Sequence, residues 1–304
     1  ADDFRVLRLQ NGLYIQRHAP MLRVAIPYGL VNTKQVRMFA HVARTYDRGY
    51  AHFTTRQNIQ FNWPELGRVP DILADLATVQ MHAIQTSGNC IRNTTTDQFA
   101  GVAPDEVVNP LVWAEIIRQW STIHPEFAYL PRKFKIAISG STKDRAATLV
   151  HDIGLVALKD DAGHIGFRVI VGGGLGRTPI VGTVIRDFLP WRHLITYLEA
   201  VLRVYNRLGR RDNKYKARIK ILVKESTPAQ FAEWVEAEFE ATQNGPTLLS
   251  QSEVDLIAAR FTQPVYKDLP ADDAGTVTFA AAHDDFARWQ RRNVHAHRVD
   301  GYAA

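Results

Sequence analysis

The chain has 304 residues, of which 46% are hydrophobic and 22% charged, a balance typical of a globular protein and not of a disordered one. Its length predicts about two domains, and no run approaches the roughly 18 apolar residues that a membrane helix needs. The net charge of +6 fits a partner that is a nucleic acid, a membrane surface or an anionic ligand. The acidic start Ala1-Asp2-Asp3-Phe4 lacks the pattern of a secretory signal.

Residues 1–86 alternate short strand-like and helical patterns. Strands are predicted over 21–28, 50–55, 59–63 and 81–85, and helices over 33–46 and 69–79. Thr33 is the predicted N-cap of the first helix, which repeats apolar residues at helical spacing. This β-α-β-β-α-β order predicts a ferredoxin-like half-domain over residues 1–86.

Residues 87–245 predict a second domain, of α/β type, so the fold class is α+β. Residues 87–108 form a long loop rich in Asn, Thr and Gly, a kind of segment that is often functional. Helices are predicted over 110–123, 143–150, 190–208 and 227–242, and strands over 133–138, 153–158, 165–171 and 219–223. Three glycines at 172–174 indicate either close approach of the backbone to a ligand or a turn with positive φ. Residues 246–304 are predicted to be a linker with helical patches.

The candidate site rests on isolated cations. Lys133 and Lys135 are two residues apart, so a strand there places both ammonium groups on one face and Phe134 on the other. Like charges on one face repel each other unless an anion lies between them. The alternative is that these lysines are solvated and guard a sheet edge. Three arginines stand in apolar or turn-like settings elsewhere: Arg23, Arg56 and Arg92. Together these cations predict a pocket for a group with many negative charges.

Other catalytic patterns give weaker signals. The histidines lack metal-ligand spacing, no Gly-x-Ser-x-Gly motif occurs, and no carboxylate pair stands out. Cys90 is the only cysteine, which excludes an internal disulfide, fits a reducing cytoplasm and excludes a four-thiolate metal site made by this chain alone. Arg92 nearby could lower the pKa of its thiol, and an inert structural cysteine is the alternative. The predicted chemistry is therefore electrostatic stabilisation and protonation of an oxyanion by Arg and Lys.

Five segments, in this order, resemble the haemoprotein of siroheme-dependent sulfite and nitrite reductases. They are Met21-Leu-Arg-Val-Ala-Ile-Pro-Tyr-Gly29, Thr54-Thr-Arg-Gln-Asn-Ile-Gln60, Asn89-Cys-Ile-Arg-Asn93, Leu130-Pro-Arg-Lys-Phe-Lys135 and Val171-Gly-Gly-Gly-Leu175. The resemblance extends over about residues 8–304. It implies a ferredoxin-like half-domain packed on a larger α/β siroheme-binding domain.

The resemblance also implies roles for individual residues. The residues that would surround the substrate anion are Arg23, Arg92, Lys133 and Lys135. The residues that would bind the siroheme are Thr54, Arg56, Gln60, Asn93 and Arg218. None of these is a metal ligand. A Lys-x-Lys motif is typical of sulfite reductases and Lys-x-Asn of ferredoxin-type nitrite reductases, so Lys135 favours sulfite, which carries the higher negative charge.

The implied function is the siroheme- and anion-binding half of an assimilatory sulfite reductase, which reduces sulfite to sulfide with six electrons. Reduction of nitrite to ammonia is the alternative with the same chemistry. A basic ferredoxin-like module that binds RNA is an alternative of another class, although no Gly-Phe-x-Phe run supports it.

The chain departs from the family pattern in its cysteines. The resemblance implies a second pseudo-repeat whose four cysteines hold a [4Fe–4S] cluster, one of them bridging to the siroheme iron, and none of those cysteines is present. The expected partners are therefore the missing C-terminal half and an electron donor, either ferredoxin or a flavoprotein reductase. We expect the chain to be incomplete and inactive without them.

Overall fold

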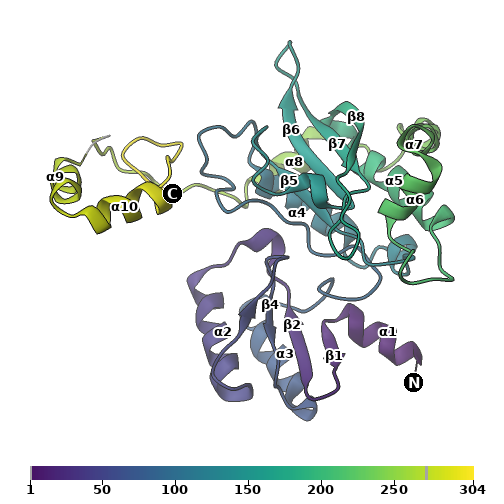
Figure 1. The fold of residues 1–304 in the computed structure, drawn as a ribbon, viewed down its shortest axis with the longest axis horizontal. Helices are drawn as coiled ribbons and strands as arrows, with labels where there is room; N and C mark the ends of the chain where they lie inside the picture. The colour runs from purple at the N-terminus through teal and green to yellow at the C-terminus, as the bar shows by residue number, and fades with distance from the viewer. Residues whose placement is uncertain (1, 271–272) are drawn as a thin grey trace.

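The computed structural model describes residues 2–270 and 273–304, which form an α+β fold with two separate four-stranded sheets (Figure 1). Helix α1 (Asp2–Gln10) leads into the first sheet, and each sheet has its own hydrophobic core. No helix of the described residues is long and apolar enough to span a bilayer.

The first sheet has the strand order β1-β2-β4-β3, and all its neighbouring strands are antiparallel. Its strands are β1 (Leu13–Ile15), β2 (Pro20–Val24), β3 (His52–Phe53) and β4 (Ile59–Phe61). Helices α2 (Thr33–Tyr46) and α3 (Val69–Ala77) supply the apolar side chains that complete its core. The helix predicted over 33–46 is confirmed, with Asn32 and not Thr33 as its N-cap in a capping box with Gln35.

Two strand predictions in this half are wrong. Residues 81–85 form no strand, because β1 pairs along the outer edge of β2 in a hairpin that the sequence patterns did not predict. The segment still contacts the backbone just after β2, where Ala25 N donates to His82 O at 2.8 Å. The strand predicted over 21–28 ends at Val24, since Pro27 begins a 3₁₀ turn in which Tyr28 has φ 44°.

The second sheet has the order β5-β6-β7-β8. Strand β5 (Ile136–Ser139) runs parallel to β6 (Ile153–Lys159), whereas β7 (Ile165–Val171) and β8 (Thr183–Pro190) continue the sheet antiparallel. The helices of this part are α4 (Pro110–Ser121), α5 (Leu194–Leu208), α6 (Ile219–Ser226), α7 (Pro228–Thr242) and α8 (Gln251–Ala258). Large buried rings such as Trp113, Phe167 and Tyr197 fill the core between the sheet and these helices.

Four predictions for this part need correction. Strand β8 was not predicted, residues 219–223 lie in α6 and not in a strand, and 143–150 contain only a 3₁₀ turn at Thr148–Val150. Lys133 and Lys135 lie just before β5. Their segment is nevertheless extended alongside residues 90–92, because Phe134 forms a parallel bridge with Ile91.

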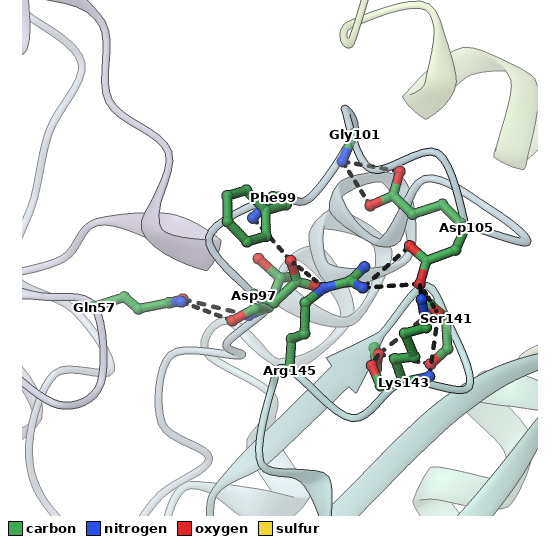
Figure 2. A network of polar contacts seen from close by, with 11 residues as sticks. Gln57, Asp97, Phe99, Gly101, Asp105, Ser141, Lys143 and Arg145 are labelled. Carbon is green, nitrogen blue, oxygen red and sulfur yellow. Dashed lines mark hydrogen bonds and ion pairs between the residues drawn. The ribbon is translucent and has the colours of Figure 1, made fainter. Parts of the chain in front are cut away.

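The loop over 87–108 carries no helix or strand, as predicted, and a polar network fixes it to the second sheet (Figure 2). Arg145 donates to both oxygens of Asp105 at 3.0 Å and approaches Asp97 Oδ1 at 3.4 Å. Gln57 of the first half binds the backbone of Thr96 through both its amide atoms. The loop is therefore tied to both halves of the chain.

The segment after 245 contains three helices in the described residues, which agrees with the predicted helical patches. Helix α8 packs on α4 through Val254 and Ile257. Helices α9 (Ala274–Ala282) and α10 (Asp284–Asn293) lie away from both sheets (Figure 1). The chain then returns to the long loop, where Arg298 N donates to Val102 O at 2.8 Å.

Candidate anion-binding site

Lys133 and Lys135 lie half-buried at the start of the second sheet, and neither ammonium group makes a hydrogen bond or ion pair with the described residues. Burial, together with Arg92 and Arg218, lowers the pKa of Lys133 to about 8. Burial, together with Arg56 and Arg218, lowers the pKa of Lys135 to about 8 as well. Burial and the neighbouring cations thus disfavour the protonated form of both amines, and an anion bound between them would favour it. The anion pocket stays a prediction.

Arg218 supplies a further cation at the N-cap of α6, held by a carboxylate that the sequence analysis missed. The Arg218 guanidinium donates to both oxygens of Asp152 at 2.7 and 2.8 Å through Nη2, and to Oδ1 at 3.0 Å through Nε. The backbone N of Lys135 donates to the other oxygen, Oδ2, at 2.8 Å. Burial raises the pKa of the Asp152 carboxyl, and these N–H donors oppose that rise by favouring the ionised form.

Arg56 points into the protein where the part built on the first sheet meets the part built on the second sheet. Its guanidinium donates to Thr95 Oγ1 at 3.0 Å, to Ile136 O at 3.1 Å and to Asn93 O, and it contacts Nε2 of His151. Burial lowers the pKa of Arg56 to about 9. Its Nε is buried and has no partner among the described residues.

Arg23 and Arg92 come together at one backbone oxygen. Arg23 Nη1 donates to Thr86 O at 3.1 Å, and Arg92 Nη1 donates to the same oxygen at 2.9 Å. Arg92 is fixed further by two bonds to Gly88 O, and Arg23 by two bonds to Gln60 Oε1. The structure therefore brings together these two arginines, which are 69 positions apart in the chain.

Tyr14 is a further polar residue here that sequence reasoning missed. The Arg23 guanidinium lies 5.5 Å from the centre of its ring. Burial opposes ionisation of the Tyr14 phenol, but Ser87, Arg92 and Arg23 outweigh burial and lower its pKa. No sequence pattern marks this tyrosine, because its neighbours come from a distant loop.

The other residues predicted to bind a cofactor make contacts within the protein. Thr54 Oγ1 accepts from Arg56 N and Asn58 N at 3.2 Å, which closes a turn. The Asn93 side chain accepts from Tyr28 N at 3.2 Å and donates to Ile26 O at 2.8 Å, across the junction of the two halves. Their roles toward a cofactor stay predictions.

The glycine run at 172–174 serves backbone packing and a turn. Gly172 has φ +84°, and a Cβ on Gly173 would lie 2.4 Å from Leu149 O. A Cβ on Gly174 would lie 3.0 Å from Lys220 Cδ and 3.6 Å from Arg218 Nη2. Of the two predictions for this run, positive φ is confirmed, and Gly174 lies beside the cations.

Cys90 fits the structural alternative. Its side chain is buried, its Sγ donates to Ser87 O at 3.2 Å, and burial raises the pKa of the thiol. Within residues 2–270 and 273–304, no three His, Cys, Asp or Glu side chains are placed to hold a metal ion. The residues present therefore do not fit a [4Fe–4S] cluster.

Two family models match the chain. The ferredoxin-like half domain of nitrite/sulfite reductases matches residues 14–79, and the nitrite and sulphite reductase 4Fe-4S domain matches residues 87–242. The chain belongs to the siroheme-dependent nitrite and sulfite reductase family. The resemblance noted from five segments is thereby confirmed, and the RNA-binding alternative is left without support.

The relatives of this chain include sulfite reductases and nitrite reductases. The chain is 32% identical over 221 residues to a sulfite reductase [ferredoxin] of Mycobacterium tuberculosis, covering 72% of this chain and 39% of that protein. It is 29% identical over 299 residues to the chloroplastic ferredoxin–nitrite reductase of Arabidopsis thaliana, covering 95% of this chain and 50% of that protein. The chain thus spans half or less of the length of these relatives.

Solved structures agree with the assignment. The Mycobacterium tuberculosis NirA protein superposes with a TM-score of 0.72 at 28% identity, covering 77% of this chain and 46% of that one. Dissimilatory sulfite reductase I superposes with a TM-score of 0.61 at 10% identity, covering 90% and 78%, which shows a shared fold alone.

Proposed function

We propose that this chain is the siroheme- and anion-binding half of an assimilatory sulfite reductase, which in the complete protein reduces sulfite to sulfide with six electrons. The observation that carries the proposal is the pair of half-buried ammonium groups, on Lys133 and Lys135, that have no acceptor among the described residues. Crowded cations with so little compensation are costly to maintain unless an anion binds to them.

The residues present fit a siroheme, a macrocycle that carries several carboxylates. The buried Arg56 Nε lacks an acceptor, and the Lys133 and Lys135 ammonium groups are free to donate charge-assisted hydrogen bonds. We propose that the following side chains hold the carboxylates: Thr54, Arg56, Gln60, Asn93 and Arg218. When bound, the siroheme supplies the iron centre at which the substrate is reduced.

Four side chains would act on the substrate anion. Arg23 and Arg92 are fixed through their shared bond to Thr86 O, and their guanidinium groups present planar donors that orient an oxyanion. Lys133 and Lys135, with pKa values of about 8, are mostly protonated at pH 7 and release a proton more easily than an ordinary lysine. A proton donor works best when its pKa lies near the working pH, so these lysines suit protonation of a reduced oxyanion.

The partners proposed for this half are the C-terminal half and an electron donor, which is ferredoxin or a flavoprotein reductase. The sulfite reductase and nitrite reductase relatives both carry ferredoxin in their names, which supports the first donor. The single buried Cys90 gives no ligand set for a cluster, so we propose that the cluster lies in the other half of the complete protein.

Nitrite reduction to ammonia remains the second candidate, because relatives of both kinds match. The discriminating position is Lys135, since sulfite carries more negative charge than nitrite and gains more from a second ammonium group. Replacing Lys135 by Asn should weaken sulfite binding about tenfold or more while changing nitrite binding less.

The test is an absorption titration of the full chain reconstituted with siroheme, using sulfite and then nitrite. We expect retained siroheme whose spectrum shifts with sulfite in the native chain, and a much weaker shift in Lys135→Asn. Lys159→Asn is the matched control, because Lys159 is exposed at the far end of β6. Equal loss of both anions in Lys135→Asn would contradict the preference for sulfite, and a native chain that holds neither siroheme nor sulfite would refute the proposal.

A further inference from the structure

The cation cluster contains a buried carboxylate that the proposed chemistry does not use. Asp152 is fully buried, and both of its oxygens are occupied by N–H donors from Arg218 and Lys135. A carboxylate close to a site for an anion would repel the ligand, so its presence needs a physical reason.

The contacts of Asp152 join the segments that build the site. Its carboxylate accepts hydrogen bonds from the backbone N of Lys135, just before β5, and from the guanidinium of Arg218, at the start of α6. Its own backbone oxygen accepts from Gly172 N at 3.1 Å, at the glycine run. One residue at the start of β6 therefore fixes the position of three separate segments around the lysines.

We propose that Asp152 is a positioning residue of the anion site, which fixes Arg218 and Lys135 in place and supplies a negative charge beside the two lysines. The inference rests on the proposed function of the same site. Asp152 does not touch the substrate in this role; it acts through Arg218, proposed to hold the siroheme, and through the lysines proposed to bind the anion.

The charged groups that face Asp152 come from several elements. They are Lys133 and Lys135 before β5, Arg56 after β3, Arg218 and Lys220 at the start of α6, and the phenol of Tyr205 on α5. For Lys133 and Lys135 the Asp152 charge acts to raise the pKa, whereas the Arg218 charge acts to lower it. The two partners of one ion pair thus act on the lysines with opposite sign.

These opposite effects allow a test that distinguishes an electrostatic role of Asp152 from a purely structural one. Asp152→Asn keeps the shape but removes the negative charge, so the pKa values of Lys133 and Lys135 should fall by roughly one pH unit. Arg218→Gln removes the positive charge, so the same two pKa values should rise by a similar amount. If Asp152 and Arg218 only held the fold together, both variants would loosen the site, hydrate the lysines and raise their pKa values alike.

The measurement is an NMR titration of the full chain, without cofactor, whose lysines carry ¹³C-labelled methyl groups as pH probes. Asp105→Asn is the matched control, because Asp105 binds Arg145 through both oxygens (Figure 2) and is not among the charges that shift the pKa values of Lys133 and Lys135. Opposite shifts in the two variants, with none in the control, support the inference. Lysine pKa values that rise or do not change in Asp152→Asn overturn it. If Asp152→Asn does not fold, lysine pKa values that fall or do not change in Arg218→Gln overturn it instead.

Sulfite binding gives a second readout, in which the effect of Asp152→Asn on the affinity depends on pH. At pH 6 Lys133 and Lys135 are protonated, so Asp152→Asn removes only a repulsion and should bind sulfite at least as tightly as the native chain. At pH 8 the variant lysines have lost their protons, and its affinity should be several-fold weaker. A native chain that binds no sulfite at either pH contradicts the proposed function, while the lysine titration still decides the role of Asp152.

Discussion

Replacing Lys135 by Met should stabilise the empty protein while destroying the site. Methionine keeps the apolar stem that the lysine buries, and it removes an ammonium group crowded by Arg56, Arg218 and Lys133. The gain arises because the folded state resists the lysine's charge. It therefore measures the combined penalty of burying this charge and of placing it beside other cations.

The magnitude follows from the pKa of Lys135. The difference between the ordinary value of 10.5 and about 8 corresponds to roughly 3 kcal/mol, at about 1.4 kcal/mol per pH unit. Because Lys135 is only half-buried, screening by solvent reduces the expected gain to about 1–2 kcal/mol. The folded pKa lies below the unfolded one, so the penalty is complete below pH 8 and disappears as pH rises toward 10.5.

The assay is urea unfolding of the native chain and of Lys135→Met at pH 7 and at pH 10, with Lys159→Met as the control. We expect the variant to gain about 1–2 kcal/mol at pH 7 and clearly less at pH 10, and the control to change by less than about 0.5 kcal/mol. Sulfite should raise the midpoint of the native chain and leave that of the variant unchanged. A variant less stable than the native chain at pH 7 would refute the reasoning that burial and neighbouring cations penalise the Lys135 charge.

Three further predictions concern contacts around the site. Arg56→Met removes the hydrogen bonds donated to Asn93 O and Ile136 O, so it should lower the unfolding free energy by about 3 kcal/mol in urea unfolding. A loss below about 1 kcal/mol would contradict a structural role for Arg56. Burial raises the pKa of Glu106 to about 7, so stability should fall as pH rises from 4.5 to 7, and Glu106→Gln should abolish that fall in thermal melts at both pH values. Asn32→Ala should cost about 1 kcal/mol by removing the cap of α2, and Asn32→Ser should restore it.

The helices and strands that sequence predicted well carry their own local signals. Helix α2 combines a polar cap with apolar residues at helical spacing, so its bounds over 33–46 could be predicted without tertiary information. Strand β7 is a short apolar run that ends at Gly172, and its bounds over 165–171 were likewise predictable. In both cases the local pattern and the packed structure favour the same conformation.

The misassigned run over 219–223 shows where such signals fail. Its alternation, Ile-Lys-Ile-Leu-Val, is typical of a strand, yet it forms the first part of α6. Short apolar runs cannot be assigned by periodicity alone, and here packing decides. Lys220 is buried because its ammonium group donates to Thr178 O at 2.6 Å and Leu175 O at 3.3 Å, contacts that no local pattern could indicate.

The same limit explains what was missed at the site. Its cations could be predicted because charge in an apolar setting is visible in the sequence. Asp152 and His151 stand side by side at the start of β6, and their partners lie 66 positions away at Arg218 and 95 positions away at Arg56. A carboxylate whose role depends on such distant partners can be recognised only after the chain has folded.

The position of the cluster across the two halves gives the fold a direct bearing on function. Arg23 and Arg56 come from the first half, whereas Lys133 and Lys135 belong to the second. Asn93 binds Ile26 O, and Arg56 binds Ile136 O, so the junction is held by the same residues that line the candidate site. Any movement between the halves would change the spacing of the cations, and the site therefore demands a rigid junction. The buried polar contacts at this junction are costly to leave unsatisfied, which makes them suited to hold that spacing fixed.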